Sequence, residues 1–184
     1  MRWLHVGCGP IGCPIPMQFA GWQEIRMDIE PAVKPDMIGS ITSIDLPDNS
    51  MDGVYASHVL EHVETWEVQP ALGEVLRVLK PGASAIIVTP DLVAWCREII
   101  ENPGYVERST PGTGMGPVSP IDALFGFQSD VYAGLEGMRH RTAFTSLTLA
   151  DHLRVAGFAS AKVLAQAWQL CAVAQKGLDN GKEG

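Results

Sequence analysis

The sequence lacks a run of apolar residues long enough to cross a bilayer, and it has few cysteines and no cluster of basic residues. A membrane-spanning helix needs about 20 consecutive apolar residues, so we expect no membrane partner. The formal net charge of −8 repels phosphate backbones, so we expect no nucleic acid partner. The N-terminal residues run directly into a strand and glycine pattern, which predicts no signal peptide. The four scattered cysteines then indicate reduced thiols in a cytoplasmic protein.

The chain has 184 residues, 46% of them apolar. This length and composition predict a single folded domain that spans residues 1–184. Strand-like and helix-like segments alternate in the first half, which predicts an α/β fold with a parallel sheet. We expect strands at residues 2–6, 23–28, 36–39, 52–57, 83–89, 158–164 and 168–174. We expect helices at residues 66–79, 91 to about 101, and 146–155, with Lys80-Pro81-Gly82 ending the first helix and turning the chain.

Residues 102–143 differ in composition from the rest, because they are rich in Gly, Pro, Ser and Met. A segment of this length inside a compact domain is usually a lid or a binding element, so we expect an inserted lid or acceptor segment here. Its aromatic side chains either line an acceptor pocket or form a small core of the segment itself. They are Tyr105, Phe125, Phe127 and Tyr132.

Residues 7–12 read GCGPIG, and an acid, Asp28, ends the next predicted strand. Glycines in this pattern let the backbone approach a ligand closely, and the carboxylate accepts hydrogen bonds from ribose hydroxyls. A dinucleotide site also needs a helix that begins inside the glycine loop. Three prolines, Pro10, Pro14 and Pro16, interrupt that stretch, which disfavours NAD. The pattern therefore predicts a site for a ribose-bearing ligand without a pyrophosphate.

A second pattern, SHVLEH, contains His58, Glu61 and His62 in the H-x-x-E-H spacing of a reversed zinc-peptidase signature. A zinc hydrolase needs a third protein ligand, normally from a later helix, and Glu98 and Glu101 are the helical candidates. We expect no metal ion, since the order of the surrounding motifs has another explanation.

The ordered set of motifs resembles the class I S-adenosylmethionine-dependent methyltransferases, and within them the type 11 small-molecule branch. The resemblance covers residues 2 to about 175. Its pieces, in order, are LHVGCGP, GWQEIRMDIEP, DLPDNSMDGVYASHVLEHV, EVLRVLKPGASAIIVTPD and HRTAFTSLTLADHLRVAGF. It implies a Rossmann-like, doubly wound, mostly parallel seven-stranded sheet with a C-terminal antiparallel hairpin strand. It also implies S-adenosyl-L-methionine as the cofactor and S-adenosyl-L-homocysteine as the product. The implied acceptor is a small molecule, glycan-related or a secondary metabolite.

The resemblance also implies the residues of the cofactor site. The methionine part of the cofactor would lie against Gly7, Cys8 and Gly9, and the ribose would bind Asp28. The adenine would lie between Ile29 and the segment Ser40-Ile41-Thr42. Ser57 and His58 would face the sulfonium and the acceptor. Three positions depart from the family pattern: His5 replaces an acid, Ile11 replaces a glycine, and Ser40 replaces an acid near the adenine.

A hydroxyl acceptor benefits from a general base of near-neutral pKa, and histidine fills that role. His58 is the first candidate, and it either acts as the base or only hydrogen-bonds backbone or cofactor. His62 follows one turn later, and His140 follows the inserted segment, so both are further catalytic candidates. Two alternatives remain open at this point: a non-catalytic cofactor-binding partner protein and the zinc hydrolase. A homodimer is compatible with the sequence.

Overall fold

Seven strands form one sheet in the computed structural model, which describes residues 1–105 and 118–179. All seven predicted strands are present, most within one or two residues of the expected bounds. They are β1 (Arg2–Val6), β2 (Gln23–Asp28), β3 (Met37–Ile38), β4 (Met51–Ser57), β5 (Leu79–Pro90), β6 (Ser160–Gln166) and β7 (Gln169–Gln175).

The order of the strands across the sheet is β3-β2-β1-β4-β5-β7-β6. The strands β1 to β5 pair in parallel, whereas β7 runs antiparallel to both β5 and β6. The order reverses between β1 and β4, and in open α/β sheets ligands bind beyond the carboxyl ends of the strands at such a reversal. The predicted Rossmann-like α/β sheet with an antiparallel C-terminal strand is therefore confirmed.

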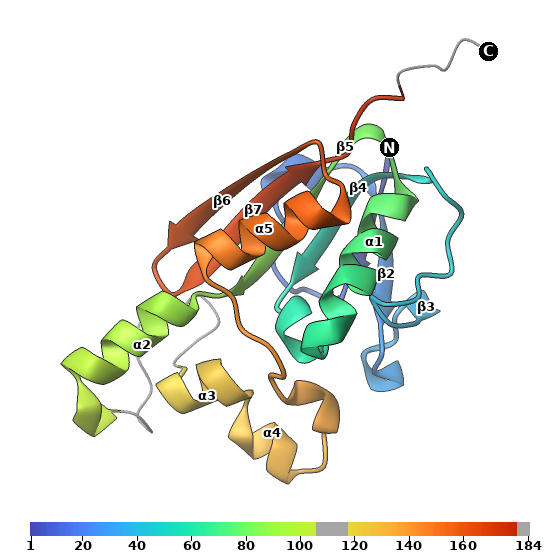
Figure 1. Cartoon of the computed structure of the whole chain (residues 1–184). Coiled ribbons are helices and arrows are strands. Elements are labelled where there is room, and N and C mark those ends of the chain that lie inside the picture. Colours follow the sequence, from blue (N-terminus) through green and yellow to red (C-terminus); the bar gives the residue numbers. More distant parts are fainter. Residues whose placement is uncertain (106–117, 180–184) are drawn as a thin grey trace.

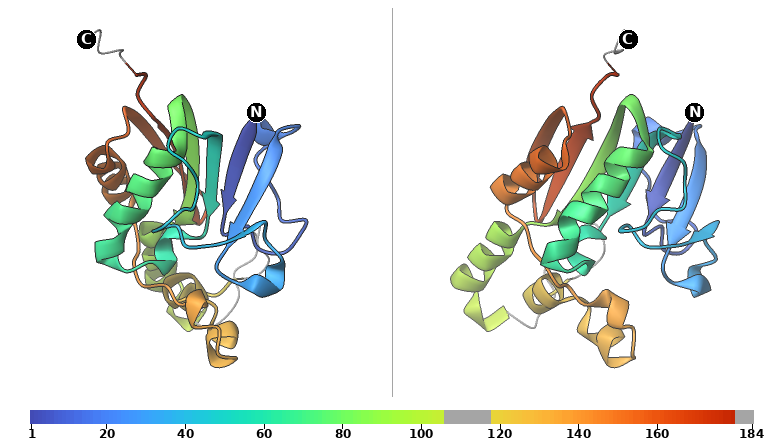
Figure 2. Two further views of the ribbon diagram at one scale, coloured as in Figure 1. Left: turned by 90° about the vertical axis from the view of Figure 1, so that its right-hand side faces the viewer. Right: turned by 45° about the vertical axis from the view of Figure 1, so that its right-hand side comes forward.

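Two helices, α1 (Val68–Val78) and α5 (Ser146–Ala156), lie side by side against one face of the sheet (Figures 1 and 2). Their buried side chains share one core with strand residues such as Leu4, Val54 and Ile87. In residues 1–105 and 118–179, none of the helices is long and apolar enough to cross a membrane.

The helix α5 shows how the sequence sets its own ends. Thr145 and Thr148 form a capping box at the start, in which each side chain accepts from the other residue's backbone N–H. Gly157 ends the helix with a φ of 100°, a left-handed conformation that glycine adopts without steric cost. Between these ends, Leu149 and Leu153 lie four residues apart and are fully buried.

Replacing Leu153 with alanine is expected to lower the free energy of unfolding by about 2–5 kcal/mol, because the change leaves a cavity under α5. Leu147 lies on the same helix but is 81% exposed, so Leu147→Ala is the matched control, with an expected change within about 0.5 kcal/mol. Urea denaturation followed by circular dichroism measures both. Equal losses in the two variants would contradict the packing described here.

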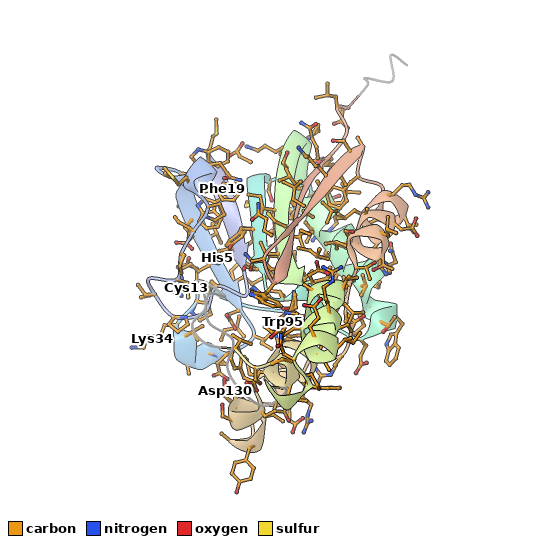
Figure 3. The ribbon with its side chains drawn as sticks, turned by 90° about the vertical axis from the view of Figure 1, so that its left-hand side faces the viewer. His5, Cys13, Phe19, Lys34, Trp95 and Asp130 are labelled. Carbon is orange, nitrogen blue, oxygen red and sulfur yellow. The ribbon has the colours of Figure 1, made fainter. Side chains whose placement is uncertain are left out.

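The opposite face of the sheet carries a cluster of aromatic rings. Trp3 stacks on Phe19 with ring centroids 4.7 Å apart, and Phe19 meets Trp22 edge to face. Figure 3 shows Phe19 and His5 on this face. Phe19 belongs to the short 3₁₀ turn Met17–Phe19, which follows Pro16. This turn places the Phe19 ring against the sheet. The prolines thus permit only a single turn where a dinucleotide-binding protein would have a long helix.

The segment after β5 lies beyond the carboxyl ends of the parallel strands, at the opposite end from the N-terminus (Figure 1). It contains α2 (Leu92–Glu101), α3 (Pro120–Phe125) and α4 (Gln128–Tyr132). A small cluster joins α2 to α3 and includes Trp95, Val118, Ala123, Leu124, Phe127 and Trp168. Of the aromatic residues predicted to line an acceptor pocket or form a local core, Phe127 joins this cluster. Phe125 and Tyr132 are exposed, and the side chain of Tyr105 lies outside the described part of the chain.

The segment Lys80-Pro81-Gly82 differs in part from its prediction. The helix α1 does end just before it, at Val78, but β5 begins at once with Leu79, which pairs with Met51 of β4. A register shift follows, and Gly82 has a φ of 77°, so the chain bends within the strand. The strand is longer than the apolar run because backbone pairing, rather than apolar side chains, defines its first residues.

Candidate functional site

The backbone of the loop after β1 packs closely against Val59, just beyond the end of β4. Gly7 and Gly9 have φ values of 63° and 58°, which favour glycine. A Cβ atom on Gly7 would lie only 2.3 Å from Cγ2 of Val59, the residue that follows His58. Cys8 is buried, and its backbone N–H donates to Met27 O at 3.1 Å. The glycine motif therefore places the loop in contact with the end of β4.

Replacing Gly7 with alanine is expected to lower the free energy of unfolding by about 2–4 kcal/mol, from backbone strain and the clash with Val59. The matched control is Gly73→Ala inside α1, where a Cβ meets nothing within 4 Å and alanine favours the helix by up to about 1 kcal/mol. Adding Val59→Ala to Gly7→Ala removes the clashing methyl and should restore part of the loss. A double variant that is simply the sum of the two single losses would exclude the contact as the cause.

Asp28, at the end of β2, is tied to this loop. Its Oδ2 accepts from Gly9 N at 2.9 Å, and its Oδ1 accepts from Glu30 N at 2.9 Å. Each carboxylate oxygen keeps a further lone pair for a ligand hydroxyl. A residue that the sequence did not single out, Arg26, donates to the carbonyl oxygens of Gly9 and Lys34. Arg26 and Asp28, both on β2, therefore hold Gly9 at its carbonyl oxygen and at its N–H, respectively.

The residues predicted to flank an adenine ring lie in two different settings. Ile29 is 59% exposed, and a Cβ on Gly137 would lie 3.1 Å from its Cδ1. The 3₁₀ turn Glu136–Met138 of the inserted segment therefore reaches Ile29. Ser40 and Thr42 join their hydroxyls at 2.8 Å, whereas Ile41 is buried in the main core. Only the backbone of Ile41, not its side chain, can face a ligand.

His5 stands where the family pattern has an acid, and it belongs to the aromatic face. The ring is buried, stacks on Trp3 and packs at a tilt against Tyr55. Its Nδ1 lies 2.7 Å from Oε1 of Glu24. Burial lowers the pKa of His5, and the nearby Glu24 carboxylate offsets part of that change. Where the family pattern has an acid on β1, this chain has His5, and the neighbouring carboxylate belongs to Glu24 of β2.

His58 follows Ser57 at the carboxyl end of β4, with a φ of 54° that is unusual for a residue other than glycine. Its backbone N–H donates to Val88 O, and its Nδ1 lies 3.1 Å from Oε1 of Glu61. Its Nε2 lies 3.4 Å from Oε1 of Gln169, on β7. Burial lowers the pKa of His58, but the hydrogen bond and charge of Glu61 outweigh it, so the pKa is raised. The imidazole is thus oriented from two directions.

Glu61 is a buried acid in this region, with 1% of its surface exposed. Burial disfavours its charged form, but the hydrogen bond and charge of His58, with smaller contributions from His62 and His140, hold the pKa of Glu61 below its usual range. Its backbone carbonyl also accepts from Arg141 N at 2.8 Å and Thr142 N at 3.1 Å. The end of the inserted segment is therefore anchored on the turn that carries Glu61.

The structure brings the three predicted catalytic histidines around Glu61. The rings of His62 and His140 meet edge to face with centroids 4.8 Å apart. The H-x-x-E-H pattern, in contrast, does not lie on an α-helix: His58 precedes a single 3₁₀ turn, Leu60–His62, and has a left-handed backbone with a φ of 54°. The helical arrangement that a reversed zinc peptidase requires is therefore absent from residues 57–63, all of which the structure describes.

Two partners of this cluster were missed by sequence reasoning. Glu61 was considered only as a zinc-peptidase residue, and Gln169 was not considered at all. Gln169 is 111 residues from His58, and it reaches the site only because β7 inserts between β5 and β6. The buried acid had a weak signal, since a glutamate between two apolar positions, Leu60 and Val63, is unusual for a solvated turn.

Residues 4–87 match a family described as a methyltransferase domain. No curated protein matches the sequence. Among solved structures, an S-adenosylmethionine-dependent methyltransferase from Archaeoglobus fulgidus is 16% identical with a TM-score of 0.60, and the match covers 95% of this chain and 86% of that one. One from Methanosarcina mazei is 18% identical with a TM-score of 0.61, covering 97% and 93% of the two chains.

A third similar structure is the 1,6-didemethyltoxoflavin-N1-methyltransferase of Burkholderia thailandensis. It is 15% identical with a TM-score of 0.59, and the match covers 96% of this chain and 71% of that one. That structure holds 1,6-didemethyltoxoflavin and S-adenosylhomocysteine. At these identities the likeness concerns the fold.

Proposed function

We propose that the chain is a class I S-adenosylmethionine-dependent methyltransferase, which the family match over residues 4–87 and the shared fold support. We propose further that it methylates a hydroxyl oxygen of a small molecule, glycan-related or a secondary metabolite. The observation that carries the proposal is the pair of His58 and Glu61 at the carboxyl end of β4, beside the glycine loop. A histidine oriented by a buried carboxylate is the arrangement that activates a hydroxyl nucleophile.

The cofactor supplies a methyl group made electrophilic by its positive sulfur. In the proposed reaction, the acceptor oxygen forms a bond to the methyl carbon as the carbon–sulfur bond breaks, and the hydroxyl proton passes to His58. Glu61 stabilises the imidazolium that results, because its Oε1 lies 3.1 Å from Nδ1. The protein contributes orientation and the exclusion of water, which together lower the barrier of an in-line displacement.

The proposed cofactor contacts follow the placement of the loop and the strand ends. Gly7, Cys8 and Gly9 offer backbone to the methionine part, and Asp28 offers its carboxylate to the ribose. The exposed Ile29 supports a place for the adenine, because an apolar side chain at a strand end is suited to a flat ring. The other proposed contacts are Ser40, Thr42, the backbone of Ile41, Ser57 and His58.

The inserted segment supports a small acceptor rather than a macromolecule. Residues 139–142 are bonded to the turn that carries Glu61, through Arg139 O to His62 and through the N–H groups of Arg141 and Thr142. The turn Glu136–Met138 comes to Ile29. Contacts of this segment with both ends of the site restrict the room for an acceptor, which supports a ligand of limited size. We propose that it serves as the acceptor lid of a single domain.

The proposal is tested by offering the untagged protein S-adenosylmethionine with a panel of hydroxyl-bearing metabolites, sugars and phenols. The expected result is formation of S-adenosylhomocysteine together with a product heavier by one methylene unit. Amine-only acceptors serve as the comparison. A product methylated only at nitrogen or carbon would contradict the oxygen acceptor, while leaving the methyltransferase assignment in place.

A further inference from the structure

One carboxylate oxygen of Glu61, beside His62 and His140, has no role in the proposed proton transfer. Glu61 Oε1 is bonded to His58, whereas Oε2 is buried and has no hydrogen-bond partner among residues 1–105 and 118–179. A buried carboxylate oxygen without a partner is costly, because it has lost water and gained nothing in return. Besides His58, the imidazole rings of His62 and His140 lie close to this carboxylate. The site therefore offers a negative oxygen that a cation would satisfy.

Both histidines present an unprotonated nitrogen. Nδ1 of His62 lies 3.0 Å from the carbonyl oxygen of Arg139, and Nδ1 of His140 lies 2.9 Å from that of Ala123. A carbonyl oxygen only accepts, so each Nδ1 carries the hydrogen and each neutral ring leaves Nε2 with a free lone pair. Metal-binding histidines are held in the same way, with the far ring nitrogen donating to a carbonyl or carboxylate.

The distances fit a single ion. One ligand atom from each of Glu61, His62 and His140 lies within 4.8 Å of the others. Around zinc, with bonds of about 2.0–2.2 Å, ligand atoms lie roughly 3–3.6 Å apart, so a shift of about 1 Å closes the set. A cavity of about 10 Å³ borders Glu61 and His140, together with Thr89 and Thr142. It has room for one water or one ion.

The two arginines near the end of the inserted segment are both paired with acids. The guanidinium of Arg139 pairs with Glu136 at 2.6 Å, and that of Arg141 pairs with Glu64 at 3.2 Å. The two arginines thus contribute backbone atoms to the site while their charges are neutralised elsewhere. The local ligand set is one buried carboxylate and two imidazoles, which suits a divalent transition-metal ion.

We propose that Glu61, His62 and His140 bind one divalent transition-metal ion, with zinc as the ion that two imidazoles and a carboxylate suit best. This differs from the expectation of no metal, and also from the H-x-x-E-H set, since His140 takes the place of His58. Three protein ligands leave a coordination position open for an acceptor oxygen. That use of the open position rests on the proposed function, whereas the ion site does not.

The test uses full-length, untagged protein that has been stripped with a chelator, with Co²⁺ as the spectroscopic probe and Zn²⁺ as the competitor. We expect visible Co²⁺ absorption that saturates at one ion per chain and disappears as Zn²⁺ is added. We also expect Zn²⁺ to raise the unfolding temperature, because an ion that binds only the folded chain stabilises it. Absence of both signals in the folded protein would overturn the proposal.

Variants locate the ion. Glu61→Gln keeps the shape but removes the charge, and His140→Ala removes a ligand from a different segment, so one remains informative if the other fails to fold. Each should weaken Co²⁺ binding by on the order of 100-fold or more, since even indirect partners of metal ligands contribute 10- to 100-fold. His152→Ala, in α5, is the control and should bind as the wild type does. Wild-type affinity in the folded variants would assign the ion to another site and overturn the proposal.

The same metal-free protein is titrated with S-adenosylhomocysteine by calorimetry. Binding of the nucleoside without binding of Co²⁺ or Zn²⁺ overturns the ion site alone. Binding of the ion without the nucleoside retains the ion site and removes the basis for linking it to an acceptor. The two failures are therefore distinguishable.

Discussion

Asp28→Ala is expected to weaken S-adenosylhomocysteine binding by roughly 100- to 10,000-fold. We propose that the carboxylate accepts hydrogen bonds from both ribose hydroxyls, and each hydrogen bond to a charged group contributes about 1.5–3 kcal/mol. The variant also loses the bonds from Gly9 N and Glu30 N that fix the loop. Isothermal titration calorimetry of wild type and variant measures the change.

Two controls separate ribose recognition from general damage. Asp28→Asn keeps the side-chain shape and one acceptor oxygen, so its affinity should fall between those of wild type and alanine variant. Asp151→Ala removes an exposed carboxylate on α5 that pairs only with Arg154, and it should bind as the wild type does. If Asp28→Ala, confirmed to be folded, binds within threefold of wild type, Asp28 does not hold the ribose.

His58→Ala should lower turnover by roughly 100- to 10,000-fold while leaving S-adenosylhomocysteine affinity nearly unchanged, because general-base catalysis contributes about that much to the reaction rate. The acceptor is the best hydroxyl compound from the screen, and the readout is the rate of S-adenosylhomocysteine formation at saturating substrates. The split between turnover and cofactor affinity distinguishes a proton-transfer role from a cofactor contact.

Gln169→Ala is the informative companion to that experiment. The amide holds Nε2 of His58 at 3.4 Å, so its loss should alter turnover less than loss of the imidazole itself. His152→Ala, outside the cluster, controls for the loss of any histidine. A rate for His58→Ala equal to that of the wild type would remove the base from the mechanism and leave His58 as a structural residue.

The strands could be predicted because their signals are local. Apolar runs such as 83–89, each bounded by Gly, Pro or an acid, indicate strands without reference to the rest of the chain. The helix α5 was also predictable, but its packed side was not fully so. Leu147 and Val155 fit the apolar pattern and yet face solvent, because only Leu149 and Leu153 share the stripe that meets the sheet.

The site was predictable only as far as motifs reach. Gly7, Asp28 and His58 could be proposed as site residues because they lie in motifs with a fixed order. Which atoms meet around Glu61 could not be assigned, because its neighbours come from segments about 80 residues further along the chain and depend on how the inserted segment docks. The left-handed backbone of His58 also has no sequence signature.

The central claim is that the carboxyl end of β1 and β2 binds the nucleoside of S-adenosylmethionine. Calorimetric titration of the wild-type chain with S-adenosylhomocysteine tests it most directly. The account predicts one binding site per chain with a micromolar dissociation constant, and a matching rise in the unfolding temperature. The claim would be contradicted if millimolar S-adenosylhomocysteine produced no binding heat and no rise in the unfolding temperature.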